Sequence, residues 1–329
     1  MAIPFILGVI AGGGALATGG AMYDMNKAKN INKEAQEIAD NATSRRDRTR
    51  RSTNSSLENL GKTKIFILGE SMKRFADSYG QIKKYVPLPL NSRDELKNLS
   101  DTEFHEIEQA CFKASDMLKA GLGGIATGSL AAAGVCGLVS TFGVASTGAA
   151  ISGLAGAAAT NATLAWLGGG AVAASGGGVA VGARILGGIF GAPALLIGGL
   201  YLTAKSDKAL NDACANRDKA RKYEQEIRNE CSAMNAIKDR ADQIRDLLEK
   251  LNKNFNSVIY YNLEKIIENY GYNPRYYDNS TLDRIEVARY FAKTMKTILN
   301  TSLLREDGGL NEYDSKKALD VGRNLLARC

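Results

Sequence analysis

The chain has 329 residues, a net charge of +7, five prolines and one histidine. Scarce proline and long charged segments favour helices over a β-sandwich or barrel, so we expect an all-α fold. Basic and acidic residues alternate almost everywhere, as on solvated helix faces, which argues against a nucleic-acid partner. The five cysteines include no CxxC pair, which argues against a disulfide framework or a zinc site and fits a reducing compartment.

Residues 1–22 form an apolar N-terminal segment that we expect to be helical. Gly8 and Gly12, like Ala15 and Gly19, are four residues apart, which places small side chains on one helix face and allows another helix to approach closely. A cleaved signal peptide is the alternative, because Ala15-Leu16-Ala17 resembles a cleavage site. No Lys or Arg precedes the apolar part, however, and secretory signals normally have one. We therefore expect a membrane-facing or core-facing helix.

Residues 23–120 are expected to form a first helical arm. An early heptad-like stripe is followed by a dense basic cluster and a run of Ser, Thr and Asn that interrupt it. The cluster consists of Arg45, Arg46, Arg48, Arg50 and Arg51. Two interpretations stay open: these arginines contact anionic lipid head groups, at ~1 kcal/mol each near a membrane surface, or they lie on a solvated helix.

Apolar residues at helical spacing resume after the basic cluster and predict a helix over 57–85. The stripe is Leu57, Leu60, Leu68, Met72, Phe75, Tyr79 and Ile82. Pro87 and Pro89 should stop that helix, because proline lacks the amide donor. Asn91 or Ser92 is expected to cap the next helix, whose stripe leads directly into a glycine-rich region. That stripe is Phe104, Ile107, Cys111, Ala114 and Leu118.

Residues 121–204 are built mostly from Gly, Ala, Ser and Thr, and Arg184 is their one charge. The segment is about four times the ~20 residues that one spanning helix needs. Glycine costs a helix about 1 kcal/mol in water but lets helices pack closely, so we expect a Gly/Ala-rich hydrophobic hairpin that inserts into a bilayer. Arg184 would line a water-filled path, reach an interface or lie in a loop. The expected membrane-inserting residues are Gly124, Gly128, Trp166, Gly178, Gly182, Arg184, Gly187 and Gly191.

Residues 205–329 are expected to form a second arm. Apolar residues recur every seven positions, which predicts one long helix in a coiled-coil-like pair with helix 57–85 or 92–118. The first heptad position is Ala213, Ala220, Ile227, Met234, Ala241, Leu248 and Phe255. Tyr270-Gly271 should end this helix. A further helix capped by Ser280 or Thr281 and a short C-terminal helix should follow. The whole chain is thus expected to be an elongated bundle.

Several stretches of this chain are similar to a family of bacterial glycine-rich (glycine-zipper) helical membrane-associated proteins. They are the run Ala157–Gly170, the triplet at Gly176, Leu186-Gly187-Gly188, Ser52–Lys62 and Leu303–Gly308. The resemblance covers most of the chain and implies a bacterial membrane association, and it carries over no catalytic residue to this sequence. A hydrophobic hairpin between two long arms also resembles helical pore-forming proteins and defence effectors.

These patterns lead us to expect a non-enzymatic protein whose partner is the membrane lipid. The hairpin would insert and form a pore or disrupt the bilayer, while lysines on both flanks favour cytoplasmic arms. Modest hydrophobicity is compatible with a soluble form before insertion. The alternative is a coiled-coil scaffold that self-associates or binds a helical protein. One histidine, scattered cysteines and no intact phosphate or metal motif predict no catalytic residue, cofactor or metal site.

Overall fold

A computed structural model describes residues 19–85, 99–119, 206–305 and 309–328. These residues form helices, with a single isolated β-bridge between Leu304 and Leu310. The predicted all-α fold with long helices is therefore confirmed for the described part of the chain. The chain divides into two compact units. Unit 1 comprises residues 1–46 and 192–229, and unit 2 comprises residues 47–191 and 230–329.

The first long helix is α1 (Gly19–Ile67), and it continues through a π-helical turn, η1 (Leu68–Met72), into α2 (Lys73–Lys83). It runs without a break through the arginine cluster and the Ser/Thr/Asn run that we expected to interrupt its stripe. The reason is local: Thr53 and Ser56 are buried, and their hydroxyls bond to the neighbouring helix and to the preceding turn. Polar residues at these positions thus belong to a helix interface.

The second long helix is α7 (Ser206–Ile259), which continues through another π-helical turn, η5 (Tyr260–Glu264), into α8 (Lys265–Tyr270). The residues at the first heptad position, from Ala213 to Phe255, are all buried, as the repeat predicts. The predicted end at Tyr270 is also confirmed. Gly271 has a φ of 73°, a left-handed conformation that stops the helix and that glycine adopts at little cost.

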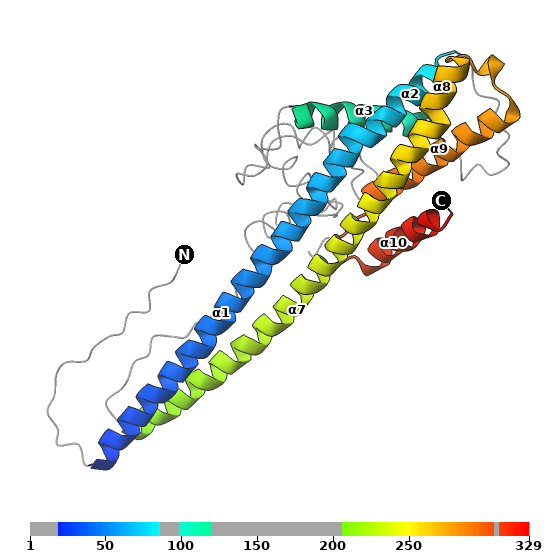
Figure 1. The fold of residues 1–329 in the computed structure, drawn as a ribbon. Coiled ribbons are helices and arrows are strands. Elements are labelled where there is room, and N and C mark those ends of the chain that lie inside the picture. The colour runs from blue at the N-terminus through cyan, green and yellow to red at the C-terminus, as the bar shows by residue number, and fades with distance from the viewer. Residues whose placement is uncertain (1–18, 86–98, 120–205, 306–308, 329) are drawn as a thin grey trace. The chain divides into compact units, whose positions relative to one another are not determined.

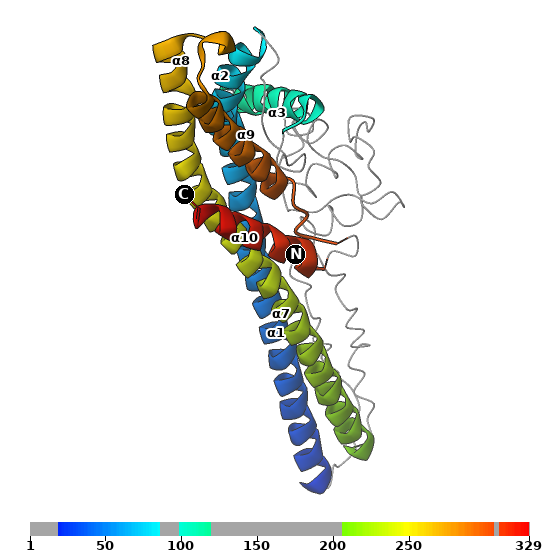
Figure 2. The same ribbon diagram turned by 90° about the vertical axis from the view of Figure 1, so that its right-hand side faces the viewer.

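Helices α1 and α7 run in the same direction in each unit (Figures 1 and 2). In unit 1, the side chains of Asn32 and Asn216 are hydrogen-bonded, 184 residues apart in sequence. In unit 2, Thr53 bonds to the carbonyl of Met234, 181 residues away. The paired residues are separated by nearly the same number of residues in sequence at both places, which requires that the two helices run parallel. Parallel helices need a long return connection, and residues 84–205 lie between α2 and α7.

Unit 1 consists, in its described residues, of the first part of α1 and the first part of α7. Ala28, Ala209 and Ala213 form a small apolar contact, with Ile31 and Leu210 beside it. Small side chains let the two helices approach closely. Polar pairs add specificity along this contact: Thr43 and Tyr223 share a hydrogen bond of 3.1 Å.

Unit 2 surrounds a cluster of aromatic rings to which α2, α3, α7 and α9 all contribute. Helix α3 spans Asp101–Lys119 and α9 spans Asn279–Leu299. Phe75 lies 5.5 Å from Tyr79, 6.3 Å from Phe104 and 5.9 Å from Phe255, which stacks on Phe291 at 5.1 Å. Ring pairs at these distances add roughly 1 kcal/mol each beyond burial. The cluster therefore joins the two long helices to the two shorter ones.

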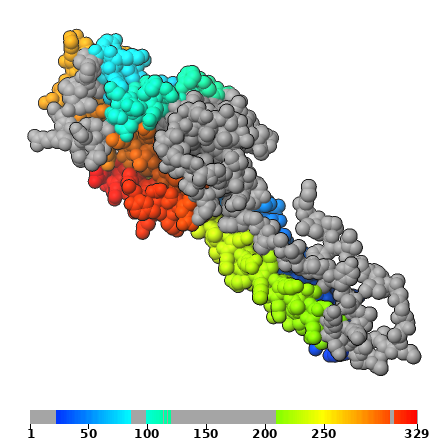
Figure 3. Space-filling view, turned by 180° about the vertical axis from the view of Figure 1, so that it is seen from behind, coloured from blue at the N-terminus to red at the C-terminus, as the bar shows by residue number. Residues whose placement is uncertain are grey.

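The C-terminal helix α10 (Glu312–Leu326) packs on α9 and also contacts α7. The space-filling view in Figure 3 shows α3, α9 and α10 on one face of unit 2. Gly322 marks a close approach, because a Cβ there would lie 2.6 Å from a methyl of Leu247. Arg240 of α7 donates to Ser315 and Glu312, at 2.8 Å each, and so holds the start of α10.

One predicted helix cap is corrected, and the residues predicted for another lie outside the described part of the chain. Helix α9 is capped by Asp278, whose carboxylate accepts from the Thr281 amide at 2.8 Å, rather than by Ser280 or Thr281. Helix α3 begins at Asp101, while the predicted caps Asn91 and Ser92 lie outside the described residues. Among the helices that the structure describes, none has the length and apolar character needed to cross a membrane.

Candidate functional site: the α3 junction

The membrane-inserting residues that the sequence predicts lie outside the described part of the chain. This holds for Trp166, for Arg184 and for the six glycines from Gly124 to Gly191. Their predicted roles are therefore untested by the structure. The structure does describe where the chain enters and leaves this region: α3 ends at Lys119, and α7 begins at Ser206. We therefore treat the attachment of α3, the α3 junction, as the candidate site.

The five arginines proposed as lipid contacts all lie on α1. Arg45, Arg48 and Arg51 are exposed and three residues apart, which places them toward one side of the helix. Arg46 and Arg50 are only partly exposed, and Arg50 lies 3.9 Å from Asp47. Three exposed arginines fit both interpretations, since a solvated helix and a lipid contact each require exposure.

Helix α3 starts with a reciprocal cap built from Ser100 and Glu103. The Ser100 amide donates to the Glu103 carboxylate at 2.8 Å, and the Glu103 amide donates to the Ser100 hydroxyl at 3.2 Å. This capping box satisfies two amides that the first turn leaves without helical partners. Burial raises the pKa of Glu103, but these hydrogen bonds and nearby Lys293 and Lys296 outweigh it, so the pKa lies below its usual value.

A basic stripe on α9 faces the acidic half of α3. Lys296 lies 2.5 Å from Glu106, and Lys293 lies 3.6 Å from Glu103. Arg289, buried in the same stripe, donates to the carbonyl of Leu99 at 2.9 Å. Carboxylates near a helix N-terminus also interact favourably with the helix dipole. Charge therefore fixes where α3 starts and which helix it faces.

The other side of α3 packs against the π-helical turn η1. A Cβ on Gly69 would lie 2.5 Å from a methyl of Leu118 and 3.0 Å from the backbone carbon of Ala114. Glycine is thus required for this contact, because backbone atoms of Ala114 cannot move aside as a flexible side chain can. The contact lies in the last turns of α3, next to the point where the chain enters residues 120–205.

The two π-helical turns are joined by an arginine. Arg74, just after η1, donates to both carboxylate oxygens of Glu264 in η5 at 2.9 Å and to the side chain of Asn256 at 2.9 Å. Asn256 in turn donates to Ser71 in η1 at 3.0 Å. π-Helical turns are rare and often lie at functional positions. Here they coincide with the docking of α3 at η1 and of α9 at η5.

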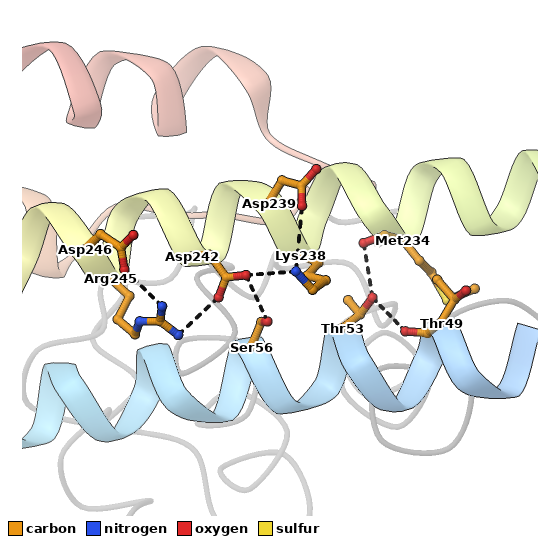
Figure 4. Close-up of polar contacts among 9 residues, drawn as sticks. All are labelled: Thr49, Thr53, Ser56, Met234, Lys238, Asp239, Asp242, Arg245 and Asp246. Atoms are coloured by element: carbon orange, nitrogen blue, oxygen red, sulfur yellow. Dashed lines mark hydrogen bonds and ion pairs between the residues drawn. The ribbon is translucent and has the colours of Figure 1, made fainter.

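A polar layer centred on Asp242 fixes α1 against α7 within unit 2 (Figure 4). Asp242 accepts hydrogen bonds from Ser56 at 3.2 Å, from Lys238 at 3.0 Å and from Arg245 at 3.2 Å. The bond to Asp242 raises the pKa of Lys238. A buried or half-buried polar layer specifies register, because any other alignment leaves its groups without partners.

Nucleophilic and metal-binding side chains do not gather at the junction. The Cys111 thiol is buried in α3, and burial raises its pKa, which disfavours the reactive thiolate. His105 is exposed and contacts Gln109 and Glu108 on its own helix. Within the described residues, no group of three His, Cys, Asp or Glu is placed to hold a metal ion. The geometry instead serves to dock a helix.

The sequence interpretation missed the residues that make this docking specific. The residues around Gly69 in the sequence do not indicate that glycine is needed there. The need arises only because the backbone of Ala114 lies so close to it in the folded structure. Arg289 lies on α9, where helical periodicity only separates solvated positions from core positions. It does not predict that this buried arginine bonds to the carbonyl of Leu99. The Ser100–Glu103 capping box was detectable, because Ser followed three residues later by Glu is a known helix-start pattern. Comparisons with protein-family models, curated proteins and solved structures found no match.

Proposed function

We propose that this is a membrane-associated helical protein in which the described helices form a scaffold and residues 121–204 insert into a bilayer as a Gly/Ala-rich hairpin. In this proposal the inserted hairpin permeabilises or disrupts the bilayer. The resemblance to bacterial glycine-rich membrane-associated proteins supports the same assignment.

One observation supports the proposal most. Both ends of the apolar segment adjoin described helices that are rich in charged residues: α3 ends at Lys119, and α7 begins at Ser206. If these two helices stay on the same side of a bilayer, the segment between them crosses it an even number of times. Lys119 on one flank and Lys205 and Lys208 on the other would then stay on the scaffold side. We propose that this side is cytoplasmic.

The α3 junction gives the proposal a mechanical basis. When the hairpin inserts, the packing of α3 on η1 and its ion pairs with α9 would keep α3 attached to unit 2. The described scaffold can therefore stay folded while 121–204 changes its surroundings. A protein of this kind needs a membrane partner and no cofactor.

The test is dye release from anionic liposomes by the purified chain. The matched control replaces residues 121–204 with a Gly/Ser-rich linker of equal length. A plain deletion is unsuitable, because it would join the end of α3 at Lys119 almost directly to the start of α7 at Ser206 and leave no connecting segment. Release by the natural chain alone supports insertion. Equal release by both proteins, or release by neither, contradicts the proposal.

The second candidate function is a scaffold that recruits partners without permeabilising a membrane. The parallel α1–α7 pair and its polar layer favour it, because such pairs are common devices for specific helix association. Liposome binding without dye release would support this candidate over the first.

A further inference from the structure

One end of unit 2 presents a group of exposed tyrosines, which we call the tyrosine end. It comprises Tyr85 after α2, Tyr270 at the end of α8, and Tyr272 and Tyr276 in the following loop. These side chains are 58%, 49%, 39% and 72% exposed, respectively. The ends of α2 and α8 lie side by side there in both ribbon views (Figures 1 and 2).

The loop that carries these rings is held by its own contacts. The hydroxyl of buried Tyr277 donates to the carbonyl of Gly271 at 2.6 Å, and burial raises the pKa of Tyr277 to about 12. The side chain of Asn273 accepts from the Arg275 amide at 3.1 Å and starts a short 3₁₀ helix, Pro274–Tyr276. The rings of Tyr85 and Tyr272 are parallel within 4°, with centroids 6.5 Å apart. The exposed rings are thus displayed on a fixed loop.

Cations accompany the rings. Lys84 and Arg275 are exposed, and neither has a carboxylate partner in the described part of the chain. The nearest acidic groups are mostly engaged: Glu268 lies 2.5 Å from Lys265, and Asp278 caps α9. The exposed carboxylate of Asp283 follows on the first turns of α9. Over residues 80–85 and 265–280, four basic side chains stand against two acidic ones, a net charge of +2; the basic ones are Lys83, Lys84, Lys265 and Arg275, and the acidic ones are Glu268 and Asp278.

Tyrosine combined with lysine and arginine suits the interfacial layer of a bilayer. The ring is apolar while its hydroxyl remains hydrated, which is why tyrosine concentrates at head-group level. Among residues 80–85 and 265–280, every exposed large hydrophobic side chain is tyrosine, with no exposed Leu, Ile or Phe to insert more deeply. Tyrosine is also common at protein interfaces, but lysine is depleted there, so Lys84 favours a membrane.

We propose that the tyrosine end adsorbs to the head-group layer of an anionic bilayer and forms a second membrane contact. This contact uses no residue between 121 and 204. It shares with the proposed function only the membrane as partner, so each can fail without the other.

The test places a fluorescent reporter at the tyrosine end. The full chain with Tyr276→Trp and Trp166→Phe has its single indole at a position that is 72% exposed, so folding should be unaffected. It is mixed with vesicles of phosphatidylcholine and phosphatidylglycerol that contain brominated lipid. Quenching and a blue shift of the emission are expected. The matched control carries Tyr313→Trp with Trp166→Phe, because Tyr313 on α10 is 75% exposed and lies outside the tyrosine end. Its emission should not change.

A charge variant, Lys84→Gln with Arg275→Gln, measures the electrostatic part of the contact. At ~1 kcal/mol per cation, quencher-detected binding of the tyrosine end should weaken roughly 30-fold at low salt. Quenching at position 276 without quenching of Trp166 in the natural chain would support this contact and count against hairpin insertion. Quenching of Trp166 alone would overturn the contact and leave the hairpin proposal standing. Quenching at neither position would overturn both and assign the tyrosine end to a protein partner.

Discussion

Lys64 is a buried lysine on α1, and replacing it should make the protein more stable in a pH-dependent way. Its side chain is 1% exposed, one helical turn from Leu60 and from Leu68, which are fully buried. Burial lowers the pKa of Lys64 from 10.5 to about 7. Protonation at lower pH places a charge in this core, so the charged form is disfavoured in the folded state.

The sign of the effect follows from proton binding. Between pH 7 and 10.5 the unfolded chain holds a proton on Lys64 that the folded chain has lost, so stability rises with pH across this window. The free energy of unfolding gains about 1.4 kcal/mol per pH unit from this group, or about 5 kcal/mol across the window. Below pH 7 both states are protonated and the full cost applies. Lys64→Met removes the charge at similar length and should be the more stable protein by an amount that shrinks as pH rises.

The assay is urea unfolding followed by circular dichroism from pH 6.5 to 10. The difference between Lys64→Met and the natural chain is the measured quantity, because burial also raises the pKa of Cys111 and Tyr277, which lowers the stability of both proteins at high pH. The control is Lys62→Met, since Lys62 is 36% exposed and lies 2.7 Å from Glu58. It should change stability by less than ~1 kcal/mol. A difference for Lys64→Met that is constant with pH, or a loss of stability at pH 7, would show that burial does not disfavour the charged form of Lys64.

Three further predictions concern the α3 junction and the polar layer. Gly69→Val should destabilise unit 2 by ~1–3 kcal/mol in urea unfolding, because its side chain meets the backbone of Ala114; Gly80→Ala, whose Cβ would meet only movable side-chain atoms, should be neutral or stabilising. Asp242→Asn should lower the free energy of unfolding by ~1–3 kcal/mol, because it weakens three hydrogen bonds. The control Asp246→Asn changes a more exposed carboxylate that pairs with Arg245 alone, so it should lower the free energy of unfolding by less than ~1 kcal/mol. Equal losses would contradict the polar layer. Glu103→Gln should reduce the loss of stability on acidification. The folded-state pKa of Glu103 is lowered, so its carboxylate stabilises the fold above the unfolded-state pKa, and this stability disappears as pH falls through the folded-state pKa. An unchanged acid profile would count against the α3–α9 pairing.

The long helices could be predicted because their signal is repetitive. The first heptad position of α7 alone provides seven buried residues, and each independently indicates the same face. The apolar stripe of α3 from Phe104 to Ala114 is buried for the same reason. Periodicity could not reveal the partner or direction of α7, since a heptad pattern fits parallel and antiparallel pairs alike. The predicted partner 57–85 accounts for only part of the contact, which α1 extends back to Ala28.

The α3 junction was less predictable because it depends on single tertiary contacts. Glycine is needed at position 69 only because Ala114 of α3 packs against it. The segment between these two residues has no repeat that would predict this packing. The interruption expected at Thr53 and Ser56 had a similar cause. Polar residues were interpreted as breaks in the stripe, but in a parallel pair they supply the hydrogen bonds that fix register. The tyrosine end was visible in the sequence as the dense run from Tyr270 to Tyr277, but its exposure was not.

The proposed function requires residues 121–204 to enter a bilayer while the described helices remain a folded scaffold. The chain has one tryptophan, Trp166, and it lies in this segment, so its emission reports on insertion without any substitution. The measurement is Trp166 fluorescence on anionic vesicles with bromine placed at increasing acyl-chain depth, alongside far-ultraviolet circular dichroism of the same samples. We expect a blue shift of the emission and quenching by brominated acyl chains, with helix content retained. Unchanged emission with vesicles present in excess, or quenching accompanied by loss of the scaffold's helices, would contradict it.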